Sequence, residues 1–385
     1  MDKKWTSGNE LNYLKEVLSN MTKGNCFTDR LEQAFCGRYG VKYAIAMNSA
    51  TSAIHAALVA AGIGQGDEVI TTPYTVVMDS SIPIIVGATP VFADIDYKTH
   101  NIDPKSVEEK ITDKTKAIIP VTYHGLPYDI DGIMRIAREH SLIVIEDNAQ
   151  TQLAKYKGRL VGADAHMSLF SFERTKHISC GEGGMLITNN EEFAVEARKF
   201  AGLGFMNLTA GKSKMVAITP KDFQRPDFRR HDRLGINYRF NEFCAAVTLA
   251  QFERVDEMVE LRQKISKLYD SAFEGTNFEP QTVPQDTTHS YFTYAVKSPF
   301  TNIKDWINFY NRHLQNGGDD FYAMMQPSYK EVIMEKLGYL DKYKGSCPNA
   351  EEVQKRCMLF KTNYRSIDEA KHYVDILSKF LEEYK

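Results

Sequence analysis

The segment Ser171-Phe-Glu-Arg-Thr-Lys-His-Ile-Ser-Cys-Gly-Glu-Gly-Gly184 follows an apolar run and ends in a glycine-rich turn. An apolar run that leads into such a turn is typical of a buried strand that ends beside a ligand, because glycine lets another group approach the backbone closely. Lys176 lies within this turn. A lysine at a strand end, partly removed from water and next to a bound electrophile, is placed to form a Schiff base. The segment alone also fits a solvated loop lysine, so both interpretations stay open.

A second apolar run, Ser141-Leu-Ile-Val-Ile-Glu-Asp147, ends in two acids and predicts a buried parallel strand. Open α/β sheets bind ligands at the carboxyl ends of such strands. A carboxylate at that edge can pair with the ring nitrogen of pyridoxal 5′-phosphate (PLP) and keep it protonated. Asp147 is our candidate for this role. The alternative is that Glu146 or Asp147 only caps the following turn.

Short apolar runs alternate with helical patterns through the first half of the chain. Helical stretches such as Thr51–Ala61 and Asp131–His140 lie between the first five runs. This alternation predicts an α/β fold whose sheet is mostly parallel and flanked by helices. The predicted strands are Tyr43–Met47, Glu68–Thr71, Val91–Ile95, Ala117–Thr122, Leu142–Glu146, Ser168–Phe172 and Met185–Thr188.

The pattern changes after this half. Asn241–Phe273 is amphipathic and predicts one or two helices, and Tyr291–Val296 predicts a strand of a smaller domain. The segment 202–233 is rich in Lys and Arg without a clean period, so we expect a long loop, and loops of that length are often functional. The expected organisation is an N-terminal arm (1–25), a large PLP-binding domain (26–255) and a smaller α+β C-terminal domain (256–385).

Composition limits the class of protein. With 385 residues, 43% hydrophobic and 25% charged, the chain can bury a large core, and its net charge of −3 gives no broad basic field for nucleic acid. No signal-type stretch and no run of roughly 18 apolar residues occurs, so we expect a cytoplasmic protein without a membrane partner. The six cysteines are scattered without a C-x-x-C pair and predict neither a disulfide framework nor a zinc site, so we expect no metal.

Four motifs follow one another along the chain. They are Glu146-Asp147-Asn148-Ala149-Gln150, Ser171-Phe172 with Lys176, Gly181-Glu182-Gly183-Gly184, and Gly235-Ile-Asn237-Tyr-Arg239-Phe-Asn-Glu242. In this order they resemble the motifs of the DegT/StrS group of nucleotide-sugar aminotransferases, and the resemblance runs from about residue 25 to residue 255. It implies the fold of PLP-dependent transferases of the aspartate aminotransferase type, with Lys176 as the lysine that carries PLP.

The expected phosphate site lies at Asn48-Ser49-Ala50-Thr51-Ser52, between a predicted strand and a predicted helix. A helix N-terminus with hydroxyls and N–H groups favours an anion, although an ordinary Ser/Thr helix cap also fits. The resemblance places Ala50 and Thr51 on the phosphate, together with Ser171. It matches Asn237 to a residue that reaches the phosphate from the partner subunit, which implies a homodimer with shared sites.

The resemblance also assigns contacts to the PLP ring. Asp147 is expected at the ring nitrogen, Gln150 at the phenolic oxygen and Ala149 against one face. On the other face this chain departs from the family, which usually has an aromatic residue where Val76 follows Thr75. Tyr74 either compensates by touching cofactor or substrate, or packs within the turn, and Val76 packs on the ring.

The resemblance implies amino transfer in two halves. An amino acid donor, usually L-glutamate, converts PLP to pyridoxamine 5′-phosphate (PMP), and Lys176 moves the proton as general acid and base. A keto sugar, expected to be nucleotide-linked, then accepts the amino group, in the biosynthesis of amino sugars for lipopolysaccharide, other surface polysaccharide or antibiotics. Which nucleotide and which ring carbon take part stays open.

Substrate contacts are less well specified by the sequence. His124 and Arg239 are candidates with Tyr74, although His124 also fits a satisfied core or loop histidine and Arg239 an interface residue. A basic cluster in the long loop could meet a diphosphate or form a solvated face. Its members are Arg225, Arg229, Arg230 and Arg233.

Two other functions are compatible with the same fold. A PMP-dependent sugar dehydratase of the same superfamily has histidine at the lysine position, so Lys176 argues against it. A PLP-binding sensor without catalysis usually carries a DNA-binding segment, and the arm before residue 25 has neither the length nor the basic charge for one.

Overall fold

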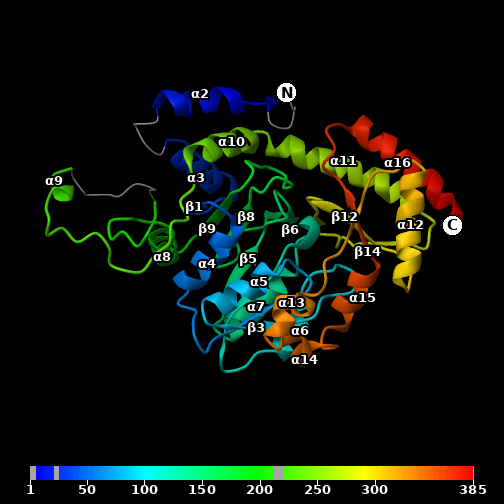
Figure 1. The fold of residues 1–385 in the computed structure, drawn as a ribbon, viewed down its shortest axis with the longest axis horizontal. Coiled ribbons are helices and arrows are strands. Elements are labelled where there is room, and N and C mark those ends of the chain that lie inside the picture. Colours follow the sequence, from blue (N-terminus) through cyan, green and yellow to red (C-terminus); the bar gives the residue numbers. More distant parts are fainter. Residues whose placement is uncertain (1–5, 21–25, 212–219, 385) are drawn as a thin grey trace.

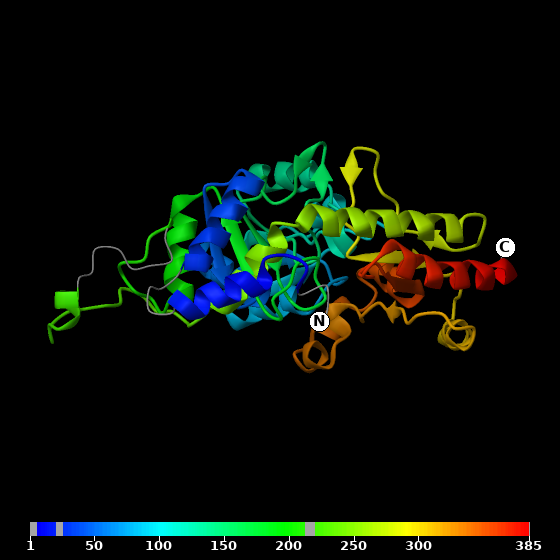
Figure 2. The ribbon, with the colours of Figure 1, turned by 90° about the horizontal axis from the view of Figure 1, so that it is seen from above.

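The computed structural model describes residues 6–20, 26–211 and 220–384. Figure 1 shows a large α/β body that contains the first three fifths of the chain, and a smaller body on one side built from the C-terminal part. In the perpendicular view of Figure 2, helix α11 (Val255–Phe273), which leaves the large body, runs alongside the C-terminal helix α16 (Ile367–Leu381). Helix α11 therefore connects the two bodies. The α/β fold with a smaller α+β part is therefore confirmed.

A seven-stranded sheet forms the centre of the large body, in the order β1-β9-β8-β5-β4-β2-β3. Strand β9 runs antiparallel to both of its neighbours, and the other pairings in the sheet are parallel. The strands are β1 (Tyr43–Met47), β2 (Glu68–Thr71), β3 (Thr89–Phe92), β4 (Thr115–Ile119), β5 (Ile143–Asp147), β8 (Met167–Ser171) and β9 (Gly184–Thr188).

Side chains that alternate along each strand build a core on both faces of this sheet. Ile119 packs toward one face and its neighbour Ile118 toward the other. The first face is covered by α4 (Ala50–Ala60), α5 (Met78–Ile85) and α8 (Glu191–Ala201). The second is covered by α3 (Cys26–Tyr39), α6 (Pro104–Glu109), α7 (Ile130–Glu139) and α10 (Glu242–Phe252), with α2 (Glu10–Asn20) lying on α10.

The smaller body has its own antiparallel sheet, in the order β10-β12-β14-β13. Its core is rich in aromatic residues and includes Phe309, Phe360 and Phe380. The strands are β10 (Glu279–Pro280), β12 (Thr293–Lys297), β13 (Tyr322–Ala323) and β14 (Cys357–Lys361). The helices are α11 (Val255–Phe273), α12 (Ile303–Gln315), α13 (Val332–Lys336), α14 (Tyr339–Tyr343), α15 (Pro348–Arg356) and α16 (Ile367–Leu381), with the short helices η3 (Ser328–Lys330) and η4 (Glu382–Tyr384).

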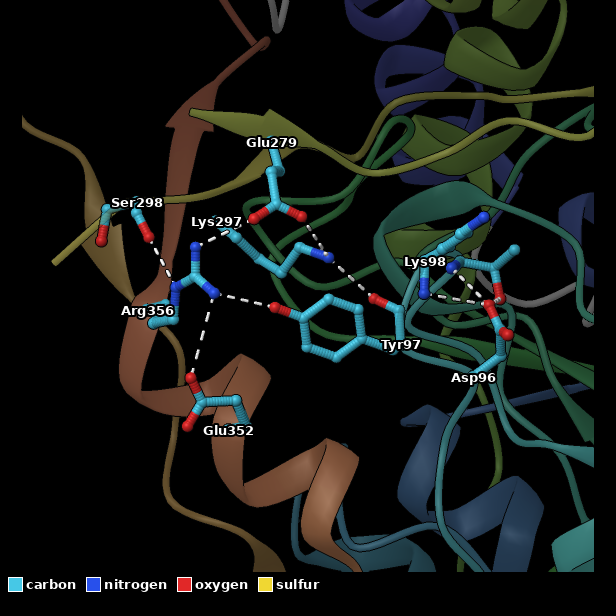
Figure 3. A network of polar contacts seen from close by, with 9 residues as sticks. Asp96, Tyr97, Lys98, Glu279, Lys297, Ser298, Glu352 and Arg356 are labelled. Carbon is cyan, nitrogen blue, oxygen red and sulfur yellow. Dashed lines mark hydrogen bonds and ion pairs between the residues drawn. The ribbon is translucent and has the colours of Figure 1, made fainter. Parts of the chain in front are cut away.

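A polar network and an apolar cluster join the two bodies. In Figure 3 the loop that carries Tyr97 meets strand β12 and helix α15. The buried Lys297 ammonium donates to the Tyr97 carbonyl at 2.9 Å, and Arg356 donates to the Tyr97 hydroxyl at 2.8 Å and to Glu279 at 3.0 Å. Beside this network, apolar side chains of both bodies pack together, among them Phe92 and Tyr329. The carboxyl ends of the large sheet are thereby held against the smaller body.

The predicted strands are confirmed within a few residues, and the stretch 241–273 forms two helices, α10 and α11. A small sheet was not predicted: β6 (Lys155–Tyr156) and β7 (Arg159–Leu160) form a hairpin that pairs with β11 (Thr287–Thr288). Of the expected loop 202–233, residues 212–219 lie outside the described part, as do residues 1–5 and 21–25 of the expected arm. The loop contains the short helix α9 (Pro220–Phe223). The domain limits at residues 25 and 255 stay a prediction.

Within the described residues, no helix combines the length and the apolar character needed to cross a membrane.

Candidate active site

The sheet register brings three of the predicted segments to one edge. Met47, the last residue of β1, pairs with Gly184, and Gly184 pairs with Ser171 at the end of β8. On the other side of β8, Asp147 at the end of β5 pairs with Leu169. Because neighbouring strands lie about 5 Å apart, the segments after β1, β8 and β5 open onto a common space.

Lys176 lies in the turn between β8 and β9. Its backbone N–H donates to the Glu173 carbonyl at 3.0 Å, which closes a tight turn, and the side chain is half-buried. The amine stands 4.5 Å from the centre of the Phe292 ring, over its face. The neighbouring His177 is buried and contacts the Ser290 carbonyl at 2.9 Å. The turn is therefore fixed on one side by the smaller body.

The surroundings of Lys176 weaken its hold on a proton. Burial lowers the pKa of the Lys176 amine, and the charge of Arg262 lowers it further, whereas Asp147 and Glu173 raise it. The amine therefore releases a proton more readily than an ordinary lysine amine does, which favours a role in proton transfer.

Asn48–Ser52 forms the expected helix start. Ser49 is the N-cap of α4, and its hydroxyl accepts a hydrogen bond from the Ser52 N–H at 3.0 Å. The cap interpretation from the sequence therefore holds, and it leaves the first turn of the helix directed at the edge of the sheet. A Cβ on residue 184 would collide with the backbone of Ser49 and Ala50. Only glycine there allows the helix start to lie against the lysine-bearing hairpin.

Asp147 is buried at the end of β5, where one carboxylate oxygen accepts the Ala149 N–H at 2.7 Å. A second buried carboxyl, Asp79 of α5, lies close enough to Asp147 for the two to affect each other's pKa, and it accepts the Thr75 hydroxyl at 2.8 Å. Burial raises the pKa of Asp79 well above its usual range, and the Asp147 charge raises it further. Burial also raises the pKa of Asp147, but the Ala149 N–H, Lys176 and Asp79 oppose that rise. Of the two carboxyls, Asp79 therefore holds a proton more tightly than Asp147 does.

Glu146 points to the opposite side of β5 from Asp147. It accepts hydrogen bonds from Asn148 and Ser168, both at 2.9 Å. Burial raises the pKa of the Glu146 carboxyl to about 7, although these hydrogen bonds lower it. The two acids at the strand end, which the sequence did not distinguish, thus have separate surroundings.

Gln150 and His124 are linked to each other. The His124 N–H donates to the Gln150 side-chain oxygen at 2.8 Å, and the imidazole Nδ1 lies 3.1 Å from the Thr293 hydroxyl. Burial lowers the pKa of His124 to about 3, so the ring is neutral. His124 therefore lies behind Gln150, within the interior. Ala149, between Asp147 and Gln150, is half-buried.

The two residues around Thr75 differ. Tyr74 is fully buried, and its ring packs edge-on against Tyr123 at 5.3 Å between centroids. Val76 has 39% of its surface exposed. The position that the resemblance assigned to one ring face is therefore open to solvent, whereas Tyr74 packs within the interior, as the turn-packing alternative expected.

Asn237 and Arg239 lie beside the helix start. The Asn48 N–H donates to the Tyr238 carbonyl at 2.9 Å, and Met47 pairs with Arg239 across an isolated bridge. Both Asn237 and Arg239 are exposed, as are Leu234, with 92% of its surface accessible, and Ile236.

The basic cluster of the long loop is partly neutralised by acids. Arg225 pairs with Asp227 at 2.6 Å, and Arg233 pairs with Glu196 and Asp232. These pairs favour the interpretation of the cluster as a solvated face over that of a diphosphate site.

Sequence reasoning missed two residues at this site. Arg262 of α11 is buried and donates to the carbonyls of Phe292 at 2.8 Å and, more weakly, of Thr175 and Lys176 at 3.4 and 3.5 Å. Burial lowers the pKa of Arg262 to about 9. The amphipathic pattern of this helix predicts that Arg262 faces solvent. Asp79 gave a weak signal, a single acid within an apolar stretch from Val76 to Ile85.

This combination of a mostly parallel sheet with a lysine hairpin, a buried aspartate and a helix start at one edge defines the class of PLP-dependent transferases. The sequence profile of the DegT/DnrJ/EryC1/StrS aminotransferase family matches residues 6–375, and the chain belongs to that family. It is a PLP-dependent aminotransferase.

Solved structures agree with this assignment. The aminotransferase from Psychrobacter cryohalolentis superposes with a TM-score of 0.85 at 29% identity, over 97% of each chain. 3-Amino-5-hydroxybenzoic acid synthase superposes with a TM-score of 0.85 at 25% identity, over 97% of this chain and 96% of that one. S. venezuelae DesV, solved with a ketimine intermediate, superposes with a TM-score of 0.83 at 25% identity, over 97% and 94%.

The polar groups at this sheet edge are those that a PLP cofactor requires. A carboxylate at Asp147 matches a protonated ring nitrogen, and the helix start held against Gly184 matches a phosphate.

Proposed function

We propose that Lys176 carries PLP as a Schiff base and transfers the proton during amino transfer from L-glutamate to a nucleotide-linked keto sugar. The observation that carries this proposal is the pairing of Lys176 with Asp147: they lie at one sheet edge, and Asp147 is the largest charge interaction of the lysine amine. A sensor without catalysis or a dehydratase would not need a lysine amine with a lowered pKa at this edge.

The other residues of the site would bind the PLP cofactor. Ser171 and the first N–H groups of α4, at Ala50 and Thr51, bind the phosphate. Asp147 accepts the ring N–H, and Gln150 binds the phenolic oxygen. Ala149 and Val76 lie against the two ring faces.

When bound, PLP supplies a ring that withdraws the electrons released at the donor α-carbon. Asp147 would keep the ring nitrogen protonated, and Asp79 beside it opposes the rise in the pKa of Asp147 and so favours its charged form. With PLP bound, the Lys176 amine would accept the proton released at the donor α-carbon and return it within the same site. In the second half-reaction the same amine would move a proton in the opposite sense while the keto sugar is aminated.

A homodimer with shared sites is part of the proposal. Its support is the exposed segment 234–239, in which Leu234 has 92% of its surface accessible and lies next to the helix start that binds the phosphate. A second subunit would cover these apolar side chains and would bring its Asn237 and Arg239 toward the neighbouring site. We place the reaction in the cytoplasm and in the biosynthesis of amino sugars for surface polysaccharide, including lipopolysaccharide, or for antibiotics.

The experiment that tests the donor half-reaction is absorbance spectroscopy of the PLP-loaded protein before and after addition of L-glutamate. We expect the band of the lysine-bound cofactor to bleach to the PMP form, with release of about one 2-oxoglutarate per site. Lys176→Ala should bind PLP without the lysine-bound band, and Lys176→Arg, which keeps the charge, should behave in the same way. Lys155→Ala, on the exposed side of β6, is the control and should match the wild type.

A wild-type protein that forms the lysine-bound band but stays inert to glutamate contradicts the assigned donor. Absence of the band in the wild type contradicts the Lys176 assignment. If L-glutamate converts the protein to the PMP form, that form can be tested with nucleotide-linked and with free keto sugars. A preference for free keto sugars would contradict the assigned acceptor.

A further inference from the structure

A second group of polar side chains is buried behind the active site. His100 follows β3, His124 lies in the short helix η2 (Tyr123–Gly125) after β4, and Cys357 begins β14. One donor atom from each lies within 4.8 Å of one from each of the others, and all three residues are buried. The large body contributes both histidines and the smaller body the cysteine, so the cluster lies between them.

Several polar atoms of this cluster have no hydrogen-bond partner in the described part of the chain. They are both ring nitrogens of His100, Nε2 of His124 and the hydroxyl of Tyr74, whose ring lies 5.9 Å from His100 and 6.0 Å from His124. Buried nitrogen and oxygen atoms in native proteins are nearly always paired with protein, water or an ion. A concentration of such atoms in one place therefore points to a bound group.

The ring nitrogens suit a metal ion. Each imidazole has at least one buried nitrogen without a hydrogen-bond partner in the described part of the chain, and such a nitrogen can offer its lone pair to a metal. The Thr293 hydroxyl occupies Nδ1 of His124 and leaves Nε2 for the cluster. A hydrogen bond to one ring nitrogen is the usual way in which a metal-binding histidine is oriented.

The cysteine can supply the third ligand. Its sulfur is buried and lies within 4.8 Å of a ring nitrogen of each histidine. A coordinating metal displaces the thiol proton to solvent, because the thiolate is the binding form. The charge of Lys297 does not exclude a cation, since its ammonium is already engaged by the Tyr97 carbonyl and by Glu279 at 3.3 Å (Figure 3).

We propose that His100, His124 and Cys357 bind one divalent transition-metal ion, zinc or copper, that fastens the smaller body to the large one. Two imidazoles and a thiolate are the ligands that these ions prefer, and the Tyr74 hydroxyl stands beside the remaining position. The ion is structural: it holds the turn whose His124 N–H bonds to Gln150 and does not contact the amino donor.

Metal content of the full-length, untagged, PLP-loaded protein is the first measurement. We expect about one zinc or copper ion per chain by mass spectrometry of the metals. X-ray absorption at the metal edge should show one sulfur and two imidazole ligands, and this result does not depend on any variant being folded. Transamination is not involved, so failure of this proposal and failure of the proposed function are distinguishable.

Cobalt substitution tests the ligands one by one. After metal removal, titration of the wild type with Co²⁺ should give a thiolate-to-cobalt charge-transfer band that saturates near one ion per chain. Difference spectra between equally PLP-loaded samples cancel the absorbance of the cofactor. Cys357→Ser should lose the band, and His100→Phe should weaken Co²⁺ binding by roughly 10- to 100-fold. Cys347→Ser, a buried cysteine of the same apolar cluster, is the matched control and should keep the band.

Two results overturn the proposal. One is a wild-type protein that holds no stoichiometric metal and gives no thiolate band with Co²⁺, in which case ordered water partners these atoms. The other is a band that survives in Cys357→Ser but disappears in Cys347→Ser.

Discussion

Glu146 and Asp147 are adjacent residues of β5 with opposite surroundings. Glu146 accepts from Asn148 and Ser168 and packs into the large body, whereas Asp147 meets Asp79 and stands in the field of Lys176. Burial raises the pKa of both carboxyls. Burial alone therefore does not separate a structural acid from a functional one, and the groups that face each acid do.

The largest expected effect is a loss of activity when Asp147 is replaced by asparagine. Asp147→Asn keeps the size of the side chain but removes the charge that, in the proposed function, would hold the ring nitrogen protonated. We expect kcat/KM for the donor half-reaction to fall by roughly 10²–10³-fold, with Tm close to that of the wild type. Stopped-flow absorbance checks the rate, and calorimetry checks the fold. A fall of less than about threefold would remove Asp147 from the site.

The next largest effect is a loss of stability when Glu146 is replaced. Glu146→Ala leaves the Asn148 amide and the Ser168 hydroxyl without their buried acceptor. The free energy of unfolding in urea should fall by about 1–3 kcal/mol, while the activity per folded molecule should stay within about threefold of the wild type. A loss of activity that exceeds the loss of folded protein would contradict the separation of the two acids.

Asp79 tests whether the support of Asp147 matters. Asp79→Ala removes the carboxyl that opposes the rise in the pKa of Asp147, so this pKa should rise further and the charged form of Asp147 should be lost more readily as the pH falls. We expect kcat/KM to fall by about tenfold at pH 6 and less at pH 8, since one pKa unit is worth about 1.4 kcal/mol. Asp79→Asn keeps a donor and should stay near the wild type. Equal losses in both variants at every pH would contradict the hydrogen-bond role.

The last expected effect is a change in how steeply the free energy of unfolding depends on pH. The pKa of Glu146 is raised in the folded protein to about 7, above the value of about 4.3 in the unfolded chain. Its contribution is therefore complete at low pH and is lost as the pH rises through about 7. Glu146→Gln should make the free energy of unfolding less dependent on pH between about 4.5 and 7, by up to about 1.4 kcal/mol per unit. Parallel curves for wild type and variant would show that Glu146 titrates normally.

Local patterns predicted the elements that carry the site. The apolar runs before Asp147 and Lys176 marked β5 and β8, because a strand buried on both faces is apolar throughout. The helix start at Ser49 followed from its capping chemistry. The placement of these segments at one edge is a consequence of the parallel order, which alternation with helices predicts.

Contacts between distant segments were not predictable in this way. Arg262 reaches the lysine turn from a helix whose pattern indicates a solvated arginine. His100, His124 and Cys357 come from three separate parts of the chain, so their spacing has no metal-binding signature, and the sequence predicted no metal. Of these three residues, the sequence singled out only His124, as a candidate substrate contact. Its position behind Gln150 depends on contacts with Thr293 of the smaller body, which local patterns do not predict.

The antiparallel strand β9 has a consequence for the order of folding. Because β9 turns back along β8, the lysine turn is closed by the Ser171–Gly184 pair, a contact between residues close in sequence. Such a contact closes at low entropic cost, whereas the docking of β14 beside the turn at His124 must wait for most of the chain. During synthesis on the ribosome we therefore expect the lysine hairpin to form while the C-terminal body is still emerging.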